Sequence, residues 1–362
     1  MSARVLCAPD KLRGALDAAG AARALAAGAR AAGAAAVELP IADGGEGTLD
    51  AFRDGAEIAT VAARDALGRP GSGRIARLDD AGTFLVEAAE AVPLHALAEH
   101  ERDVERASSH GAGELIAAAL DRGARRLLVA VGGTATMDGG AGLLRALGAR
   151  CADDGAGLLA DQTVDLGGID RRLREVELEL LVDVAAPLTG PDGAARRFGP
   201  QKGAAPEQVA AFDAAHARWA QALGIDPATP GAGAAGGLGA ALQAVGARTV
   251  AGAEAVLALK RFDALLEGCD LCLTAEGSVD ASTLQGKAVA AVVAHCAAAG
   301  VPVVVLGGRV EPRAAAELRR RGAREVRAIG PAGRPLARAL AAAGDELREA
   351  ARTAVGAAPA AR

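Results

Sequence analysis

The sequence predicts an α/β protein built on parallel sheets, and two observations carry this prediction. Short apolar runs rich in Val, Ile and Leu recur along the chain, and longer stretches of Ala, Leu and Arg with helical spacing separate them. Such alternation of strand and helix is typical of parallel-sheet proteins. The length of 362 residues exceeds what one hydrophobic core usually serves, so we expect two domains.

The apolar runs give the expected strands in chain order, which are Arg4–Ala8, Val37–Ile41, Arg126–Val131, Leu178–Val184, Asp270–Thr274, Val301–Leu306 and Glu325–Ile329. The helical stretches include Asp17–Gly33, Gly113–Arg122, Glu207–Leu223 and Pro335–Ala354. Asp17 is a suitable N-cap for the first helix, and Pro335 suits the first position of the last one. Between Glu57 and Ala91, alternating runs flank a Gly-rich turn at 68–73, which predicts a hairpin and the entry into a second domain.

The composition argues against several classes of function. There are 40 Lys and Arg against 45 Asp and Glu, and the basic residues form no stripe that would follow a nucleic-acid backbone. The first residues contain no apolar stretch before a cleavage site, and no apolar run is long enough to cross a bilayer, so we expect a cytoplasmic protein without a membrane partner. The five cysteines are scattered and odd in number, which predicts reduced thiols; Cys269 and Cys272 have metal-ligand spacing but no second pair.

Most expected strands end in a loop of glycines with carboxylates or hydroxyls, and a helix follows. Open α/β sheets bind their ligands at this edge. Glycines let backbone N–H groups approach phosphate oxygens, and a helix N-terminus adds partial positive charge. Several such loops with acids and lysines among them predict a site for an anionic substrate.

The segment Gly132–Gly142 is the most glycine-rich of these loops and also carries two threonines and one acid. A tight packing turn is the plain alternative, but packing rarely needs so many glycines beside Thr and Asp. The candidate contacts to phosphate or nucleotide are therefore Gly132, Gly133, Thr134, Asp138 and Gly139.

Two further segments supply carboxylates. In Ala42–Thr48, Asp43 and Glu46 suit a metal ion or the proton of a substrate hydroxyl, although Asp43 or Thr48 would equally cap a helix. In 274–287, Glu276 and Asp280 suit Mg²⁺ and Lys287 suits phosphate oxygens, which is the set that phosphoryl transfer needs.

Some features of the chain argue against other readings. Lys287 does not belong to a Walker A loop, because Ala281 and Ala288 stand where that motif needs Gly and a hydroxyl, and it would otherwise be a solvated charge. Gly231–Gly236 fits G-x-G-x-x-G but follows no strand, so we expect a close backbone approach to a ligand or to the other domain instead of a nicotinamide site. Lys202 either contacts a phosphate or is simply exposed.

Seven ordered segments together resemble the bacterial type of glycerate kinase over nearly the whole chain. They are Ala8–Asp10, Ala42–Thr48, Gly111–Ile116, Gly132–Gly142, Phe198–Ala204, Pro230–Gly237 and Glu276–Lys287. The resemblance implies ATP and Mg²⁺ as cofactors, D-glycerate as a small-molecule acceptor, and phosphoglycerate as product, with 2-phosphoglycerate favoured over 3-phosphoglycerate. It also implies a flavodoxin-like domain from residues 1–64 and 260–362, an α/β domain inserted at 65–259, and an active site in the cleft between them. We expect a monomer or a homodimer.

On the hypothesis of a glycerate kinase, we assign candidate roles to individual residues. Asp43 or Asp183 would accept or orient the acceptor hydroxyl, and Glu276 and Asp280 would lie near Mg²⁺. The candidate acceptor contacts are Asp10, Lys11, Arg13, Ser109 and His110, and the candidate phosphate contacts include Lys202 and Lys287.

This chain departs from the family pattern within the motifs, at Lys11, Arg13, His110, Met137, Ala275 and Ser278, and also after Asp183, where Ala185 and Ala186 replace Thr and Asn. An Arg usually stands where Ser278 and His110 are found, and Lys and Arg are not interchangeable at a bidentate site. Two alternatives follow, namely a kinase for a different small hydroxy acid and an inactive ligand-binding descendant. The acids Asp10, Asp43, Glu46, Asp183, Glu276 and Asp280 are all present, which favours an active kinase.

Overall fold

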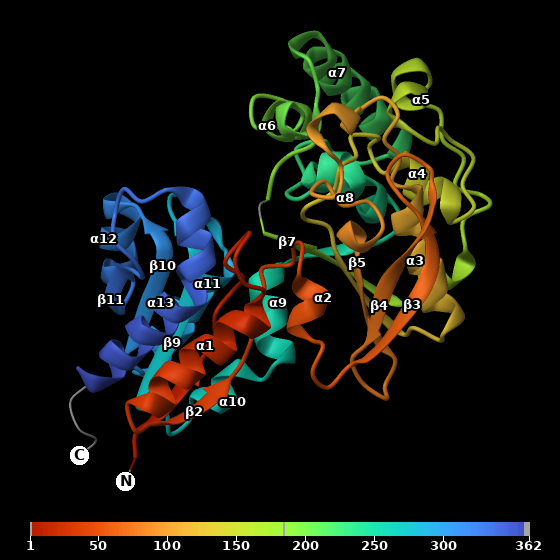
Figure 1. The fold of residues 1–362 in the computed structure, drawn as a ribbon. Coiled ribbons are helices and arrows are strands. Elements are labelled where there is room, and N and C mark those ends of the chain that lie inside the picture. Colours follow the sequence, from red (N-terminus) through yellow and green to blue (C-terminus); the bar gives the residue numbers. More distant parts are fainter. Residues whose placement is uncertain (1, 184, 358–362) are drawn as a thin grey trace. The chain divides into compact units, whose positions relative to one another are not determined.

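The structure, a computed structural model, describes residues 2–183 and 185–357 and separates into two compact units (Figure 1). The first unit contains both chain ends, up to Asp43 and again from Ala251, and the second is the continuous segment Gly44–Val250. The resemblance predicted the domain boundaries at 64/65 and 259/260, whereas the two units of the structure meet at 43/44 and 250/251. In the structure β3 (Glu57–Arg64) belongs to the second unit because it pairs along its whole length with β4 (Pro70–Arg77).

The first unit contains a parallel sheet of β1 (Arg4–Cys7), β2 (Ala35–Glu38), β9 (Leu271–Val279), β10 (Val303–Val310) and β11 (Ala323–Ala328). The strand order is β11-β10-β9-β1-β2, and every neighbouring pair is parallel. Counted along the chain within this unit, this is the 2-1-3-4-5 order of flavodoxin-like folds. The predicted α/β class and flavodoxin-like unit are confirmed.

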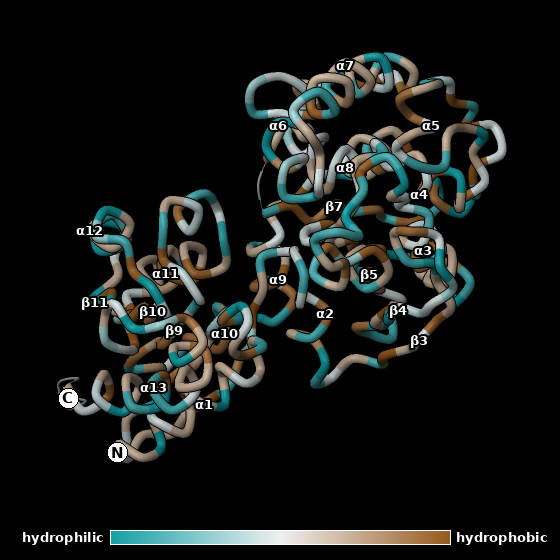
Figure 2. Tube along the Cα trace, turned by 45° about the horizontal axis from the view of Figure 1, so that its top comes forward, coloured by the Kyte–Doolittle hydropathy of each residue, from teal (hydrophilic) through white to brown (hydrophobic). Residues whose placement is uncertain are grey.

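The helices of the first unit are α1 (Ala18–Ala31), α9 (Gly252–Leu259), α10 (Phe262–Leu266), α11 (Ala288–Ala299), α12 (Pro312–Arg320) and α13 (Leu336–Gly356). Asp17 caps α1 as predicted, since its carboxylate accepts from Gly20 N at 2.6 Å. Pro335 lies one position earlier than expected, at the N-cap of α13. The helices α1 and α13 pack closely, because a Cβ at Gly28 would lie 2.0 Å from Arg348 O. Figure 2 shows hydrophobic residues gathered on the central strands β9 and β10.

The second unit contains a mixed sheet in the order β3-β4-β5-β6-β7-β8. The predicted hairpin is β3 with β4, and β4 pairs antiparallel with β5 (Thr83–Glu87). From there the sheet becomes parallel, because β5 pairs with β6 (Arg126–Ala130) and β6 with β7 (Glu177–Val182). The last strand is β8 (Arg248–Ala251), and Val184, where the expected fourth strand ended, lies outside the described residues.

The helices of the second unit are α2 (Thr48–Ala51), α3 (His110–Asp121), α4 (Ala141–Ala146), α5 (Gly155–Ala160), α6 (Ala194–Phe198), α7 (Pro206–Leu223) and α8 (Ala234–Ala244). Trp219 and Phe212 on α7 are fully buried in the core of this unit. Across the described part of the chain, no helix combines the length and the apolar character that crossing a bilayer requires.

Candidate active site

The carboxyl ends of β1 and β9 meet at the point where the strand order of the first sheet reverses. Asp10 N donates to Ala275 O at 2.9 Å, and the Thr274 hydroxyl donates to Ala8 O at 2.7 Å, so the two strand ends are tied together. Ligands of open α/β sheets bind in the crevice at such a switch point. The loop after β1 and the end of β9 are therefore the first place to seek the site.

Four carboxylates gather there with one ammonium group; we call Asp10, Asp43, Glu276 and Asp280 the acidic cluster. Glu276 is only 6% exposed and accepts a hydrogen bond from the Thr283 hydroxyl at 2.7 Å. Burial raises the pKa of Glu276 to about 7, although the Thr283 hydrogen bond and the Lys287 charge lower it, while Asp280 and Asp43 raise it again. These mutual effects place the predicted metal ligands, Lys287 and Asp43 in one electrostatic neighbourhood.

Asp10 belongs to the same neighbourhood. Burial and the negative charge of Asp43 raise its pKa well above the usual range, and Glu276 adds to this effect, while Lys11 opposes it through its charge and its backbone N–H. Asp280 behaves in the opposite way, because hydrogen bonds from Ser282 lower its pKa. Burial, together with the neighbouring carboxylates, therefore disfavours the ionised forms of Asp10 and Glu276, and a bound cation would favour them.

The donor chemistry of the cluster fits Mg²⁺, a hard cation with oxygen ligands. Among the residues that the structure describes, no group of three or more His, Cys, Asp and Glu side chains is arranged to hold a metal ion. Mg²⁺ is usually held by one or two carboxylates, with waters and substrate phosphates completing the shell. The pair Glu276 and Asp280 is compatible with that mode.

Cationic side chains border the acidic cluster in the first unit. The loop carrying Lys11 and Arg13 runs against β9, since a Cβ at Gly277 would lie 3.2 Å from Arg13 N. Arg309 on β10 pairs in register with Ser278, and its Nε donates to the Ser278 hydroxyl at 3.3 Å. Sequence reasoning missed Arg309, because only the pairing of β9 with β10 brings its guanidinium into contact with Ser278, the position at which the family usually carries Arg.

In the second unit, close packing explains why the predicted phosphate loop contains glycines, because neighbouring atoms leave no room for a side chain. A Cβ at Gly132 would lie 2.6 Å from Gly45 Cα, and one at Gly133 would lie 2.8 Å from Glu46 Cβ. At Gly139 it would lie 2.8 Å from the Trp219 ring, and at Gly140 it would meet α8. The alternative of a tight packing turn therefore accounts for these four glycines, and the phosphate contact stays a prediction that depends on the loop's other groups.

Asp138 and Ser109, predicted to contact different ligands, contact each other. The buried Asp138 carboxylate accepts from both the backbone N–H and the hydroxyl of Ser109 at 2.7 Å, and from the backbone N–H groups of Gly140 and Gly142. Burial raises the pKa of Asp138, although these hydrogen bonds lower it. The observed role of this pair is to fix the loop onto the start of α3.

Three buried side chains hold the loop from behind. Lys202 Nζ donates to Thr136 O at 2.7 Å, His216 Nε2 lies 3.1 Å from Met137 O, and Trp219 Nε1 donates to Gly139 O at 2.9 Å. Lys202 is 3% exposed, and burial lowers its pKa to about 7, while the Asp138 charge opposes this change. Lys202 thus supports the loop backbone, and it is not the exposed side chain that one alternative expected.

The hydroxyl groups of the loop remain available as donors. The Thr134 and Thr136 side-chain oxygens are buried, and neither has a hydrogen-bond partner within residues 2–183 and 185–357. Unpaired buried hydroxyls cost about 1–3 kcal/mol each. A bound anion would satisfy them, which favours the predicted ligand role of this loop.

His110, Asp183 and the end of the Ala42–Thr48 segment belong to the second unit and not to the acidic cluster. His110 Nδ1 lies 2.9 Å from Asp153 Oδ1, and this hydrogen bond lowers the pKa of Asp153. Asp183 directly follows β7. At the other end of the Ala42–Thr48 segment, the buried Glu87 carboxylate accepts from Gly47 N and Leu49 N, and the Thr48 hydroxyl donates to Gly45 O.

The sequence predicted that the Gly231–Gly236 segment approaches a ligand or the other domain, but in the structure its close backbone neighbours belong to its own unit. A Cβ at Gly233 would lie 2.0 Å from Pro187 O, and one at Gly236 would lie 2.1 Å from Thr136 O. Gly236 O accepts from Gly139 N at 3.1 Å. This segment therefore packs against the glycine loop.

A flavodoxin-like sheet with acids at its switch point, together with a second α/β unit that carries a braced glycine loop, defines the class of two-unit α/β proteins to which this chain belongs. The model of the glycerate kinase family matches residues 5–358. The chain belongs to the glycerate kinase family.

Individual relatives agree with this assignment. The chain is 38% identical over 325 residues to a glycerate kinase of Bacillus subtilis (strain 168), covering 85% of each chain. It is 36% identical over 302 residues to the glycerate 2-kinase of Escherichia coli (strain K12), covering 78% of this chain and 79% of that one. A solved structure from Salmonella typhimurium LT2, of a protein proposed to be glycerate kinase 2, superposes with a TM-score of 0.84 at 34% identity and covers 98% of each chain.

Proposed function

We propose that the protein is an ATP-dependent kinase that transfers a phosphoryl group to D-glycerate, and that the 2-hydroxyl is the acceptor. The observation that carries this proposal is the acidic cluster, where four carboxylates and Lys287 surround the switch point of the first sheet. Family membership gives the substrate class, and the Escherichia coli relative is named a glycerate 2-kinase.

Within this proposal, Asp43 accepts the proton of the acceptor hydroxyl. Its charge raises the pKa of both Asp10 and Glu276, so it lies among the groups that a substrate hydroxyl would meet. As the proton leaves, the hydroxyl oxygen forms its bond to the γ-phosphorus and the bond to the ADP oxygen breaks. Asp183 is the second candidate for this role.

Glu276 and Asp280 would hold Mg²⁺, which when bound neutralises charge on the phosphates. Lys287 lies at the N-cap position of α11, where an ammonium and a helix N-terminus both favour phosphate oxygens. Lys11 and Arg13 hold the carboxylate of the acid, and the unpaired hydroxyls of Thr134 and Thr136 donate to the nucleotide phosphates. The backbone of Gly132, Gly133 and Gly139 shapes this loop, while Asp138 and Lys202 fix it.

The test is ADP release by the purified protein with Mg²⁺ and a panel of D-glycerate, L-glycerate, glycolate, tartronate and lactate. We expect the highest kcat/KM with D-glycerate, and ³¹P NMR of the product should show phosphate on the 2-oxygen. ADP release only with another acid of the panel would identify a kinase for a different hydroxy acid, which the departures at Ser278 and His110 favour. If no acid of the panel causes ADP release, the protein is an inactive, ligand-binding descendant of the kinases.

A further inference from the structure

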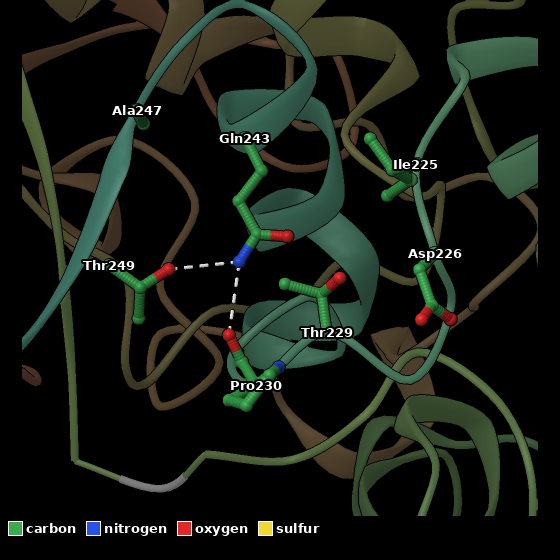
Figure 3. A pocket seen from close by; sticks show the side chains of 7 residues that line it. All are labelled: Ile225, Asp226, Thr229, Pro230, Gln243, Ala247 and Thr249. Carbon is green, nitrogen blue, oxygen red and sulfur yellow. Dashed lines mark hydrogen bonds between the residues drawn. The ribbon is translucent and has the colours of Figure 1, made fainter.

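The second unit contains an open pocket of about 550 Å³ between the chain after α7, the end of α8 and the start of β8 (Figure 3). Its lining is Ile225, Asp226, Thr229, Pro230, Gln243, Ala247 and Thr249. None of these residues belongs to the acidic cluster or to the glycine loop. The volume is within the range of small-molecule sites.

The amide of Gln243 has one fixed orientation in this pocket. Its Nε2 donates both protons, to Pro230 O at 3.0 Å and to Thr249 Oγ1 at 2.9 Å. Turning the amide over would place its oxygen against the Pro230 carbonyl, which only accepts. Gln243 Oε1 is therefore a fixed acceptor, and it is buried without a partner in the described part of the chain.

Besides Gln243, the polar side chains of the lining are the Asp226 carboxylate, which accepts, and the hydroxyls of Thr229 and Thr249, which can both donate and accept. Figure 3 shows Gln243 Oε1 directed to the side where Thr229, Ile225 and Asp226 lie. Oδ1 of the exposed Asp226 accepts from Ala228 N at 2.8 Å. The pocket thus presents a buried neutral acceptor and a carboxylate at its rim.

The apolar part of the lining complements these acceptors. Ile225, Pro230 and Ala247 provide surface without hydrogen-bonding side chains. A ligand that fits has an apolar ring, an N–H donor at its edge for the buried acceptor and hydroxyl groups for the carboxylate. An amino-substituted purine with its ribose has this chemistry.

The wall of the pocket continues into the glycine loop. From Pro230 the chain enters Gly231–Gly237, and Gly139 N donates to Gly236 O at 3.1 Å. A Cβ at Gly237 would lie 2.8 Å from Gly139 Cα. Pro230, which lines the pocket, is therefore followed directly in the chain by the segment that packs against the candidate phosphate loop.

We propose that this pocket binds the adenosine part of the phosphate donor, with the exocyclic amino group donating to Gln243 Oε1 and a ribose hydroxyl donating to Asp226. This inference rests on the proposed kinase function and extends it by giving the nucleoside a place within the second unit. It also explains how a chain with only 2% aromatic residues holds a base, namely between aliphatic side chains.

The test uses adenosine itself, which carries no phosphate, on the full-length protein. Binding is measured by saturation-transfer NMR, with ADP as competitor, for the wild type, Ala247→Trp, which fills the pocket, and Asp226→Asn, which removes only the charge. We expect at least a tenfold loss of adenosine affinity in Ala247→Trp and a loss of about fivefold in Asp226→Asn, because the amide oxygen still accepts a hydrogen bond and only the contribution of the charge is lost. Asp80→Asn, an exposed acid in another turn of the same unit, is the matched control and should bind like the wild type.

Kinetics separate this inference from the proposed function. If D-glycerate is phosphorylated and the KM for ATP is unchanged in both pocket variants, the pocket assignment is wrong and the kinase assignment stands. If no acid is phosphorylated but adenosine binding is weakened by both variants, the pocket assignment stands and the kinase assignment falls. Should Ala247→Trp not fold, Asp226→Asn decides the matter, because its side chain is exposed. Absence of adenosine binding to the wild type would overturn the inference.

Discussion

At the scale of single residues, Glu276 is the group whose titration has the clearest consequence. Its pKa is about 4.5 in an unfolded chain and about 7 in the folded protein. A carboxyl with a raised folded pKa stabilises the fold in its protonated form, so this contribution is complete below pH 4.5 and is lost as the pH rises through 7. The difference corresponds to roughly 3 kcal/mol of unfolding free energy.

We therefore predict that, without divalent cations, the free energy of unfolding falls between pH 5 and pH 8, and that Glu276→Gln removes only the part of this fall that Glu276 causes, because burial and Asp43 also raise the pKa of Asp10. Urea unfolding followed by far-UV circular dichroism measures it. Glu267→Gln, an exposed carboxylate of the same unit, should keep the pH dependence of the wild type. The same dependence in Glu276→Gln would mean that this carboxyl is not the group responsible.

A second prediction at this scale concerns the acceptor carboxylate, which needs fixed donors to enter a partly desolvated site. We expect Lys11→Ala and Arg13→Ala each to raise the KM for D-glycerate by roughly ten- to a hundredfold and to leave the KM for ATP nearly unchanged. Steady-state kinetics with each substrate varied in turn measures both constants. Arg309→Ala is the informative comparison, because Arg309 contacts Ser278.

The outcome assigns the carboxylate site. An effect confined to Arg309→Ala would show that the guanidinium missing at Ser278 is supplied by the neighbouring strand and that the loop after β1 has another role. A rise in the KM for ATP in Lys11→Ala and Arg13→Ala would place these side chains on the nucleotide phosphates.

At the scale of elements, the glycine segment beside the loop gives a stability prediction. Gly236 has φ +74°, and a Cβ there would lie 2.1 Å from Thr136 O; Gly224 has φ +71° with nothing within 4 Å. Both alanine variants pay the left-handed penalty of about 1 kcal/mol, but only Gly236→Ala must also displace the loop backbone. We expect Gly236→Ala to lose roughly 3 kcal/mol of unfolding free energy against about 1 kcal/mol for Gly224→Ala.

Chemical unfolding of the two variants and the wild type measures this difference. Equal losses of unfolding free energy would show that the Gly231–Gly237 segment can move away from Thr136 at no cost. The close contact between Gly236 and Thr136 would then not hold the glycine loop in place.

The elements that sequence reasoning found are those with strong local signals. The buried runs of β6, β9 and β10 consist largely of Val, Leu and Cys. Asp17 indicates the N-terminus of α1, and the Gly-rich turn indicates the hairpin of β3 and β4. The strand β8 has four residues without an apolar run, so its strand character comes from pairing at the sheet edge. The sequence did not predict helix α11, because a run made almost entirely of Ala and Val lacks the polar face that indicates an amphipathic helix.

The acids of the candidate site could be predicted because loops at the ends of parallel strands must share one edge of the sheet. Their partners could not, since Trp219 lies 80 residues from Gly139 and Lys202 lies 66 residues from Thr136 along the chain. A Trp on a helix and a Lys in a polar loop carry no local signal of a contact with a distant carbonyl. Only the packing of α7 and of the turn Pro200–Lys202 against the loop reveals that these side chains support it.

At the scale of the whole molecule, each unit has its own buried core. The core of the second unit includes Leu115, Leu144 and Trp219, and that of the first includes Leu25, Leu273 and Leu347. Units with separate cores commonly unfold as separate cooperative blocks. Trp219 is the single tryptophan of the sequence, so its fluorescence reports the second unit alone, whereas far-UV circular dichroism reports both.

We predict that the two signals do not coincide in urea and that variants move them independently. Gly236→Ala should lower the midpoint of the fluorescence transition and leave the other part of the dichroism change in place. Glu276→Gln at pH 8 should move only the dichroism transition, to higher urea, because it removes a buried carboxylate of the first unit that is ionised at that pH. Superimposable curves that shift together in both variants would show that the two units unfold as one cooperative block, in spite of their separate cores.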